Sequence, residues 1–287
     1  MHKSGFVNII GNPNVGKSTL MNALVGEKLS IITSKAQTTR HRILGIVNGD
    51  DFQIVFSDTP GILKPCYKLQ ESMMNFVRGA LSDADVLLYV TDTVERDDER
   101  AAEIIDRIRQ SGVPTLVVVN KIDLTTQEAL EALVEKWRAT LPDAEIIPIS
   151  AREGFNIAGL FDRILALLPE GEPFYPKDTL TDKTLRFFAS EIIREKILRN
   201  YDKEIPYSCE IEIEEYREEP GIDRISAVIY VARNSQKGIL IGHKGEKLKK
   251  VGRQAREELE EFLRKKVFLQ LFVKVSEDWR NDQRQLR

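Results

Sequence analysis

The strongest constraint on this chain is an eight-residue run near its start, Gly11-Asn12-Pro13-Asn14-Val15-Gly16-Lys17-Ser18. The run matches the pattern G-x-x-x-x-G-K-[ST], and an apolar, strand-like segment (6–10) precedes it while a helix-like segment (19–25) follows it. The glycines let backbone N–H groups turn toward phosphate oxygens, and the start of the helix adds partial positive charge. The sequence therefore predicts a phosphate-binding P-loop between a buried strand and a helix.

The P-loop assigns roles to single residues. Lys17 is expected to reach the β- and γ-phosphates, and the Ser18 hydroxyl is expected to ligate Mg²⁺. The residues expected to contact the phosphates are Gly11, Asn12, Pro13, Asn14, Val15, Gly16, Lys17, Ser18 and Thr19.

Three later segments, in the required order, favour GTP over ATP. Asp58-Thr59-Pro60-Gly61 follows a strand-like run, so that Asp58 can hold a water on Mg²⁺ and the Gly61 N–H can contact the γ-phosphate. Asn120-Lys121-Ile122-Asp123 follows the apolar run 115–119. The Asp123 carboxylate can accept two hydrogen bonds from guanine, whereas with adenine it would remain a buried carboxylate without partners, at a cost of several kcal/mol.

The other residues of these segments would complete the base site. Asn120 is expected to support the loop and the N7/O6 edge of guanine, and the aliphatic stem of Lys121 to pack along the base. Ser150-Ala151-Arg152, after a further strand-like run, can offer a backbone N–H to O6. We therefore expect GTP and GDP as the nucleotides.

Composition narrows the class of protein. The 287 residues are enough for two domains, and the net charge of −3 means that contact with a nucleic acid has to come from a local basic patch. Cys66 and Cys209 show no CxxC spacing, which argues against a zinc site or a disulfide framework and fits a reducing cytosol. No apolar run approaches the length of a membrane span, and we expect no signal peptide.

The pattern of elements predicts two domains. Residues 1–170 alternate strands and helices, which predicts a mostly parallel sheet covered on both faces, and residues 171–180 are rich in proline and glycine, as in a linker. Residues 181–287 read as a smaller α+β domain with a three-stranded sheet. Its acidic run 212–219, like the run 95–99 of the first domain, is interpreted as a solvated surface and not as a metal site.

A second glycine-containing turn, Gly242-His243-Lys244-Gly245, lies between two short helical segments of the smaller domain. This arrangement, within an α-β-β-α-α-β order, is typical of a KH domain, whose GxxG loop holds the backbone of about four nucleotides. Ile239, Leu240 and Ile241 are expected to form the floor of an aliphatic groove for bases. The residues expected to bind RNA are Lys237, Gly238, Ile241, Gly242, His243, Lys244, Gly245, Lys247 and Lys250.

A guanine-specific P-loop domain joined to a C-terminal KH domain of type II resembles the Era family of bacterial GTPases that act in small-subunit ribosome assembly. The resemblance covers nearly the whole chain. Besides the motifs above, it rests on Gln37-Thr38-Thr39-Arg40, on residues 236–242, and on Val273-Lys274-Val275 with Trp279-Arg280. It implies binding to the 3′ end of 16S rRNA, assistance to 30S assembly, and a cytoplasmic protein sometimes found at the inner face of the cell membrane. We expect a monomer and no DNA partner.

The resemblance also bears on hydrolysis. Thr38 and Thr39 are both candidates for the switch ligand of Mg²⁺, and related GTPases favour Thr39. Ile62 stands where Ras-like proteins have the glutamine that orients water, so turnover should be slow. In similar GTPases an asparagine at the position of Asn14 ligates K⁺, which supplies the charge of an arginine finger. We therefore expect Lys17, Thr39, Gly61 and Asn14 to act on the γ-phosphate, with Mg²⁺ and K⁺ as cofactors.

Two other functions stay open. A GTP-dependent RNA-modifying enzyme would need a catalytic constellation in the C-terminal domain, where the sequence shows no such pattern. A membrane-trafficking GTPase would need a lipidation signal or an amphipathic membrane helix, and the sequence shows neither. The sequence thus favours a slowly hydrolysing, GTP-controlled switch that binds RNA.

Overall fold

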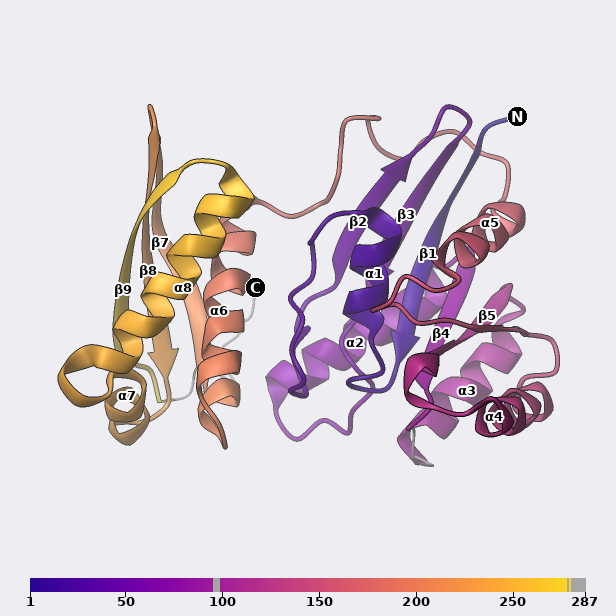
Figure 1. Ribbon diagram of the computed structural model, residues 1–287, viewed down its shortest axis with the longest axis horizontal. Coiled ribbons are helices and arrows are strands. Elements are labelled where there is room, and N and C mark those ends of the chain that lie inside the picture. The colour runs from indigo at the N-terminus through magenta and orange to yellow at the C-terminus, as the bar shows by residue number, and fades with distance from the viewer. Residues whose placement is uncertain (95–98, 278, 280–287) are drawn as a thin grey trace. The chain divides into compact units, whose positions relative to one another are not determined.

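The computed structural model of the protein describes residues 1–94, 99–277 and 279, and it divides into two compact units. The first unit contains Met1–Cys66 and Gln70–Asp182, and the second consists mainly of the residues from Lys183 onward (Figure 1). Each unit has its own sheet and its own buried core.

A six-stranded sheet with the order β2-β3-β1-β4-β5-β6 forms the centre of the first unit. All neighbouring strands are parallel except β2, which runs antiparallel to β3. The carboxyl ends of the parallel strands therefore meet at one edge, where α/β sheets of this kind bind their ligands. The strands are β1 Lys3–Gly11, β2 Ile43–Asn48, β3 Phe52–Asp58, β4 Val86–Asp92, β5 Thr115–Asn120 and β6 Glu145–Pro148.

Helices cover both faces of this sheet. On one face, Tyr89 of β4 shares a buried core with Ile104 of α3 and Trp137 of α4. On the other face, the ring of Phe161 in α5 lies 6.4 Å from that of Phe56 in β3. The helices are α1 Lys17–Val25, α2 Lys68–Ser82, α3 Glu99–Ser111, α4 Gln127–Thr140 and α5 Ile157–Leu167, with a short 3₁₀ turn, η1, at Ile122–Leu124.

The segment expected to be a linker is hydrogen-bonded to the first unit. The fully buried Gln53 of β3 accepts the N–H groups of Phe174 and Tyr175 at 2.7 and 2.9 Å, and Ile46 of β2 donates its N–H to Leu180 O at 2.8 Å. The ring of Phe174 also packs against that of Phe6, at 4.9 Å between centroids. Residues 171–180 therefore lie along β2 and β3 as part of this unit, and the domain boundaries drawn from the sequence stay predictions.

A three-stranded sheet and three main helices form the second unit. Strand β8 pairs antiparallel with β7 and parallel with β9. The inward-facing residues of all three strands share a core with α6, α7 and α8, and Figure 1 shows α6 and α8 along one face of the sheet. The elements are α6 Leu185–Asn200, η2 Ile205–Tyr207, β7 Cys209–Glu219, β8 Ile222–Val231, α7 Asn234–Ile241, η3 His243–Gly245, α8 Glu246–Leu263 and β9 Lys266–Val275.

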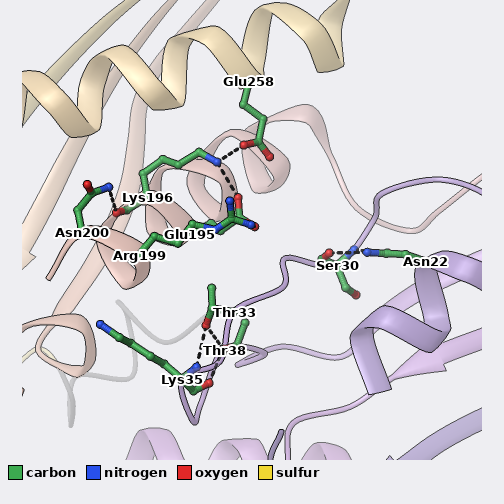
Figure 2. A network of polar contacts seen from close by, with 10 residues as sticks. All are labelled: Asn22, Ser30, Thr33, Lys35, Thr38, Glu195, Lys196, Arg199, Asn200 and Glu258. Atoms are coloured by element: carbon green, nitrogen blue, oxygen red, sulfur yellow. Dashed lines mark hydrogen bonds and ion pairs between the residues drawn. The ribbon is translucent and has the colours of Figure 1, made fainter. Parts of the chain in front are cut away.

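A buried ammonium ties two helices of this unit together. Lys196 of α6 donates to Glu195 of the same helix at 2.8 Å and to Glu258 of α8 (Figure 2). Glu195 is fully buried, so its charge has to be compensated locally, and Arg199 also donates to it at 2.8 Å. The network therefore fixes the position of α8, which carries the lysines that follow the GxxG turn.

The predicted fold class is confirmed in both units. Two elements were not predicted from the sequence, the antiparallel edge strand β2 and the helix α2. The residues 95–98 of the acidic run 95–99, and Arg280 of the C-terminal signature, lie outside the described residues. Among the described residues, no helix has both the length and the apolar character that crossing a membrane requires.

Candidate nucleotide and nucleic-acid sites

The backbone of the P-loop takes positive φ angles at both of its glycines. Gly11 and Gly16 have φ angles of 150° and 97°, and Asn14 between them has a φ of 65°. A Cβ at Gly11 would lie 2.1 Å from Val90 O, and one at Gly16 would lie 2.2 Å from Asn120 Nδ2. Both glycines are therefore needed for close approach as well as for conformation, and Gly16 caps the N-terminus of α1.

Lys17 lies at the centre of this loop with its side chain buried. Its ammonium donates to Gly11 O at 3.0 Å and to Asn12 O at 2.8 Å. Burial lowers the pKa of Lys17 from 10.5 to about 8, and the charge of Asp58 opposes part of this shift. The loop thus holds a desolvated cation next to the N-terminus of a helix, an arrangement suited to a polyphosphate.

Three oxygen-bearing side chains converge beside Lys17. The Ser18 hydroxyl lies 2.9 Å from the Thr39 hydroxyl and donates to Asp58 Oδ2 at 2.7 Å. Burial raises the pKa of the Asp58 carboxyl, while the hydrogen bond from Ser18 and the charge of Lys17 oppose the shift. The other carboxylate oxygen of Asp58, Oδ1, is buried and accepts no hydrogen bond from the described residues. This oxygen set suits a hard divalent cation.

The two switch threonines take different directions. Thr39 is buried and lies 3.5 Å from Asp58 through its hydroxyl. The Thr38 hydroxyl instead donates to Lys35 O and contacts the Thr33 hydroxyl, both at 2.6 Å, within its own loop (Figure 2). Of the two candidates, the structure brings Thr39 to the Ser18–Asp58 cluster.

A cavity of about 350 Å³ opens beside the P-loop. Its walls combine the P-loop with the loop that precedes β2, together with Gly61 and Lys121. A Cβ at Gly61 would lie 2.8 Å from Pro13 Cα, so this glycine is also required for close approach. Ile62, by contrast, is buried in the core shared with α2 and α3, and its side chain takes no part in the cavity.

The loops expected to bind the base are joined to the P-loop. Asn120 donates to Val15 O at 2.9 Å and accepts the N–H of Ala151 at 3.0 Å. Ser150 donates its hydroxyl to Asp123 Oδ1 at 2.6 Å, which orients that carboxylate. Asp123 is exposed in the protein alone, so a bound base would have to bury its carboxylate for the penalty against adenine to apply. The Ala151 N–H is donated to Asn120, so a contact from it to a base would have to be shared.

Two residues of the site were not predicted from the sequence. Asp92, at the end of β4, forms an ion pair with Lys121. Asn22 of α1 donates to Ser30 O at 2.8 Å and accepts the N–H groups of Leu29 and Ser30, so it fixes the start of the loop that leads to Thr39 (Figure 2). Asp92 could have been found from the sequence, because an acidic residue at the end of a buried apolar strand lies at the edge of the sheet where ligands bind. Asn22 had no local signal, because its partners depend on the path of the following loop.

The GxxG turn of the second unit is built from left-handed backbone. Gly242, Lys244 and Gly245 have φ angles of 71°, 48° and 79°. Two hydrogen bonds hold the helix α7, which precedes the turn. Tyr201 donates its hydroxyl to Leu240 O at 2.6 Å, and the buried Gln236 accepts the N–H of Arg233 at 3.1 Å. The last glycine forms the N-cap of α8, so helix N–H groups lie next to the turn.

Basic side chains around this turn are available to a ligand. His243, Lys244, Lys247 and Lys250 are exposed, and Lys237 is half-buried. The apolar residues before the turn do not all line a groove as expected. Leu240 is fully buried in the core and Ile241 packs against that core, while Ile239 is 43% exposed. The prediction of a three-residue floor is therefore wrong for Leu240, because the helical period turns it inward.

Comparison with known proteins identifies the two units. Residues 6–121 match a family described as 50S ribosome-binding GTPase, and residues 204–280 match the KH domain. GTPase Era of Syntrophus aciditrophicus is 46% identical over 289 residues, covering 100% of this chain and 94% of that protein. GTPase Era of Alkaliphilus metalliredigens is 45% identical and covers 100% and 98%.

Two solved structures agree over nearly the whole chain. A variant of Aquifex aeolicus Era bound to GDP·AlF4⁻ superposes with a TM-score of 0.95 at 42% identity, covering 99% of this chain and 98% of that one. An Era in complex with MgGDPNP and nucleotides 1506–1542 of 16S ribosomal RNA gives the same TM-score and identity, covering 100% and 98%. The P-loop, the guanine-type base loops and the GxxG turn on these folds, together with this full-length similarity, show that the chain belongs to the GTPase Era family.

Proposed function

We propose that this protein is a GTP-controlled switch that binds the 3′ end of 16S rRNA through its GxxG turn and assists 30S assembly. Two sets of contacts support the proposal. Ser18, Thr39 and Asp58 form one polar cluster with the P-loop, and left-handed glycines next to exposed lysines form the other. An Era that resembles this chain over its whole length was solved with MgGDPNP and a 16S rRNA fragment.

The nucleotide contacts follow from the positions of the side chains. Lys17 and the N-terminus of α1 bind the β- and γ-phosphates, and the Gly61 N–H contacts the γ-phosphate. The Asp123 carboxylate, oriented by Ser150, accepts two hydrogen bonds from guanine, and the stem of Lys121 packs along the base. Hydrolysis is slow without a further cation, because the buried Ile62 offers no group that could orient a water.

Mg²⁺ fits the residues present. Ser18 and Thr39 would hold it directly and Asp58 through a water, and the buried oxygen of Asp58 that accepts no hydrogen bond is suited to this task. When bound, the ion neutralises charge on the phosphate oxygens. Ordering Thr39 against the ion would order the loop 31–42, which is the switch.

K⁺ is the second cation that we propose, with Asn14 as its ligand from the protein. Asn14 is exposed, lines the cavity beside the P-loop and has left-handed backbone. A monovalent cation there would supply the positive charge that an arginine finger supplies in other GTPases. This role rests on the resemblance to GTPases with an asparagine at the same P-loop position.

RNA binding is assigned to the GxxG turn and to α8. Two glycines allow an approach of the RNA backbone that a Cβ would obstruct, and Lys244, Lys247 and Lys250 offset its charge. The cytoplasm, with some protein at the inner face of the membrane, is the proposed location. A monomer without affinity for DNA is the proposed state.

The decisive experiment is equilibrium binding to a labelled oligonucleotide that copies the 3′ tail of 16S rRNA. It is run with a non-hydrolysable GTP analogue, with GDP, and with the variant Gly242→Asp/Gly245→Asp. Gly221→Asp is the matched control, because Gly221 has a φ of 81° in the β7–β8 turn with no atom within 4 Å of a Cβ placed there. We expect binding that prefers the analogue, is lost in the double variant, and is kept in the control.

Equal binding of a scrambled RNA would contradict the proposal, as would equal loss in both variants. A mass change in the RNA after incubation with GTP would instead support the modifying enzyme that the sequence left open.

A further inference from the structure

Asp92 belongs to none of the motifs assigned above, yet it lies between two of them. It is the last residue of β4 and pairs in register with Asn120, the last residue of β5. Because these strands are parallel, their carboxyl ends lie side by side, and Asp92 is brought next to the loop that starts at Lys121. Its side chain is only 8% exposed.

Both carboxylate oxygens of Asp92 are engaged. One accepts a hydrogen bond from the Lys121 ammonium, and the other accepts the N–H of Val94 at 3.0 Å. Thr93 donates its hydroxyl to Lys121 O at 3.2 Å. The segment 92–94 therefore holds Lys121 by its backbone and by the end of its side chain.

Lys121 also contacts the P-loop. Its ammonium also donates to Asn14 O at 2.6 Å, so one side chain joins the end of β4 to the loop beside the phosphates. Both Lys121 and Asn14 have left-handed backbone, with φ angles of 62° and 65°. Asparagine adopts this region readily, whereas a lysine keeps it where surrounding contacts hold it. The ammonium has three donors and a flexible stem, and the two acceptors leave it few alternative positions.

We propose that Asp92 is a positioning residue of the nucleotide site. Its carboxylate holds Lys121 extended between the P-loop and the base, and so it prolongs the lifetime of bound GDP and GTP. The proposal rests on the function proposed above, in which the stem of Lys121 packs along guanine. The effect of Asp92 on the nucleotide must then pass through Lys121.

The test is a double-mutant cycle read out as the rate of nucleotide release. Fluorescently labelled GDP is displaced by excess GDP from the full-length protein and from the variants Asp92→Ala, Lys121→Ala and Asp92→Ala/Lys121→Ala. We expect release to be about tenfold faster in each single variant, and the double variant to be no faster than Lys121→Ala, because residues that act as one unit are not additive. Asp92→Asn keeps an acceptor but loses the charge, so its rate of GDP release should lie between that of the unmodified protein and that of Asp92→Ala.

Asp106→Asn is the control. Asp106 also forms an ion pair in the first unit, with Arg109 of the same helix α3 at 2.8 Å, and neither residue lines the nucleotide cavity or belongs to the switch loop. We expect its release rate to be unchanged. If Asp92→Ala does not fold, the cycle is run with Asp92→Asn, whose side chain has nearly the same size.

The outcomes separate the two proposals. Unchanged release in Lys121→Ala would contradict the proposed role of Lys121 itself. Fast release in Lys121→Ala with unchanged release in Asp92→Ala would overturn the role of Asp92 alone. Additive effects of the two substitutions would also overturn it, because Asp92 would then act on the site by another route.

Discussion

The two glycine turns of this protein look alike in sequence but differ in what their glycines do. In the P-loop, a Cβ at Gly16 would lie 2.2 Å from Asn120 Nδ2, so the protein's own packing excludes any side chain. In the GxxG turn, a Cβ at Gly245 would meet nothing closer than 4.0 Å. At Gly242 a Cβ would lie 2.8 Å from Lys247 Cγ, but that atom belongs to the side chain of an exposed lysine. The first turn is therefore enclosed by the protein, while the second is open at Gly245 and keeps that glycine for its backbone angle.

The cations beside the two turns differ in the same way. Lys17 is buried and bonded to two carbonyl groups of its own loop, whereas Lys244 is exposed between the two glycines. A small, multiply charged phosphate chain calls for a desolvated, preorganised site, where each interaction is strong. An RNA backbone is long and solvated, and exposed lysines bind it through counterion release.

Gly16→Ala should give the largest effect. The substitution adds a Cβ overlap to a left-handed φ of 97°, and together these should weaken GDP binding by about 4 kcal/mol, roughly a thousandfold. Calorimetric titration with GDP measures the loss. Gly26→Ala is the control, since Gly26 has a φ of 80° at the end of α1 with open space around it. Similar losses of GDP affinity in both variants would show that the left-handed backbone angle, and not the Cβ overlap, accounts for the effect.

The second effect is the pH dependence of the stability of the nucleotide-free protein. Because the pKa of Lys17 is about 8 in the folded protein and 10.5 unfolded, the unfolded chain binds more protons between these values, and stability should rise with pH across that window. The shift corresponds to about 3 kcal/mol. Urea unfolding at pH 7.5, 8.5 and 9.5 gives the slope, and Lys17→Met should reduce it. An equal slope in Lys17→Met would show that Lys17 is not its source.

The third prediction concerns the cation beside Asn14. We expect GTP hydrolysis to be faster in K⁺ than in Na⁺ by about a hundredfold, the lower end of what one preorganised group contributes to the rate. Asn14→Ala should bring the two rates together while GDP binding is kept, because Asn14 contacts Lys121 only through its backbone carbonyl. Initial rates in matched KCl and NaCl check this. Equal rates in the unmodified protein would exclude the K⁺ role.

The smallest effect is expected in the open turn. Gly245→Ala should lower the free energy of unfolding by about 1 kcal/mol, because only the left-handed φ of 79° opposes the new methyl group. Chemical denaturation measures the change. A decrease in the free energy of unfolding as large as that for a substitution at a buried core residue would contradict this, because it would mean that Gly245 is tightly packed.

Local sequence was enough to predict most of the fold and the identity of the nucleotide-site motifs. Buried parallel strands read as continuous apolar runs, such as the run 115–119, which the structure places in β5. Strand β2 was missed because a short edge strand with a glycine at its centre, Gly45, carries little signal. Helix α2 was missed although Met73, Met74 and Val77 show a helical apolar spacing.

Other features depended on contacts between segments far apart in the chain. The proline-rich segment 171–180 reads as a free linker, but the buried Gln53 needs partners for its amide and finds them in Phe174 and Tyr175. The Ser150 hydroxyl, 27 positions further along the chain, orients the Asp123 carboxylate. Neither result follows from the local pattern of residues.

By itself, the sequence determined which chemistry this protein can contain, because glycines, a lysine and a serine at fixed spacing between a strand and a helix can form a phosphate site. Only the tertiary structure decided which threonine meets Ser18, how far the pKa of Lys17 falls, and that Asp92 holds Lys121. Those features depend on burial and on distances between strands. Both are set by how segments far apart in the chain pack together, which the local order of residues does not reveal.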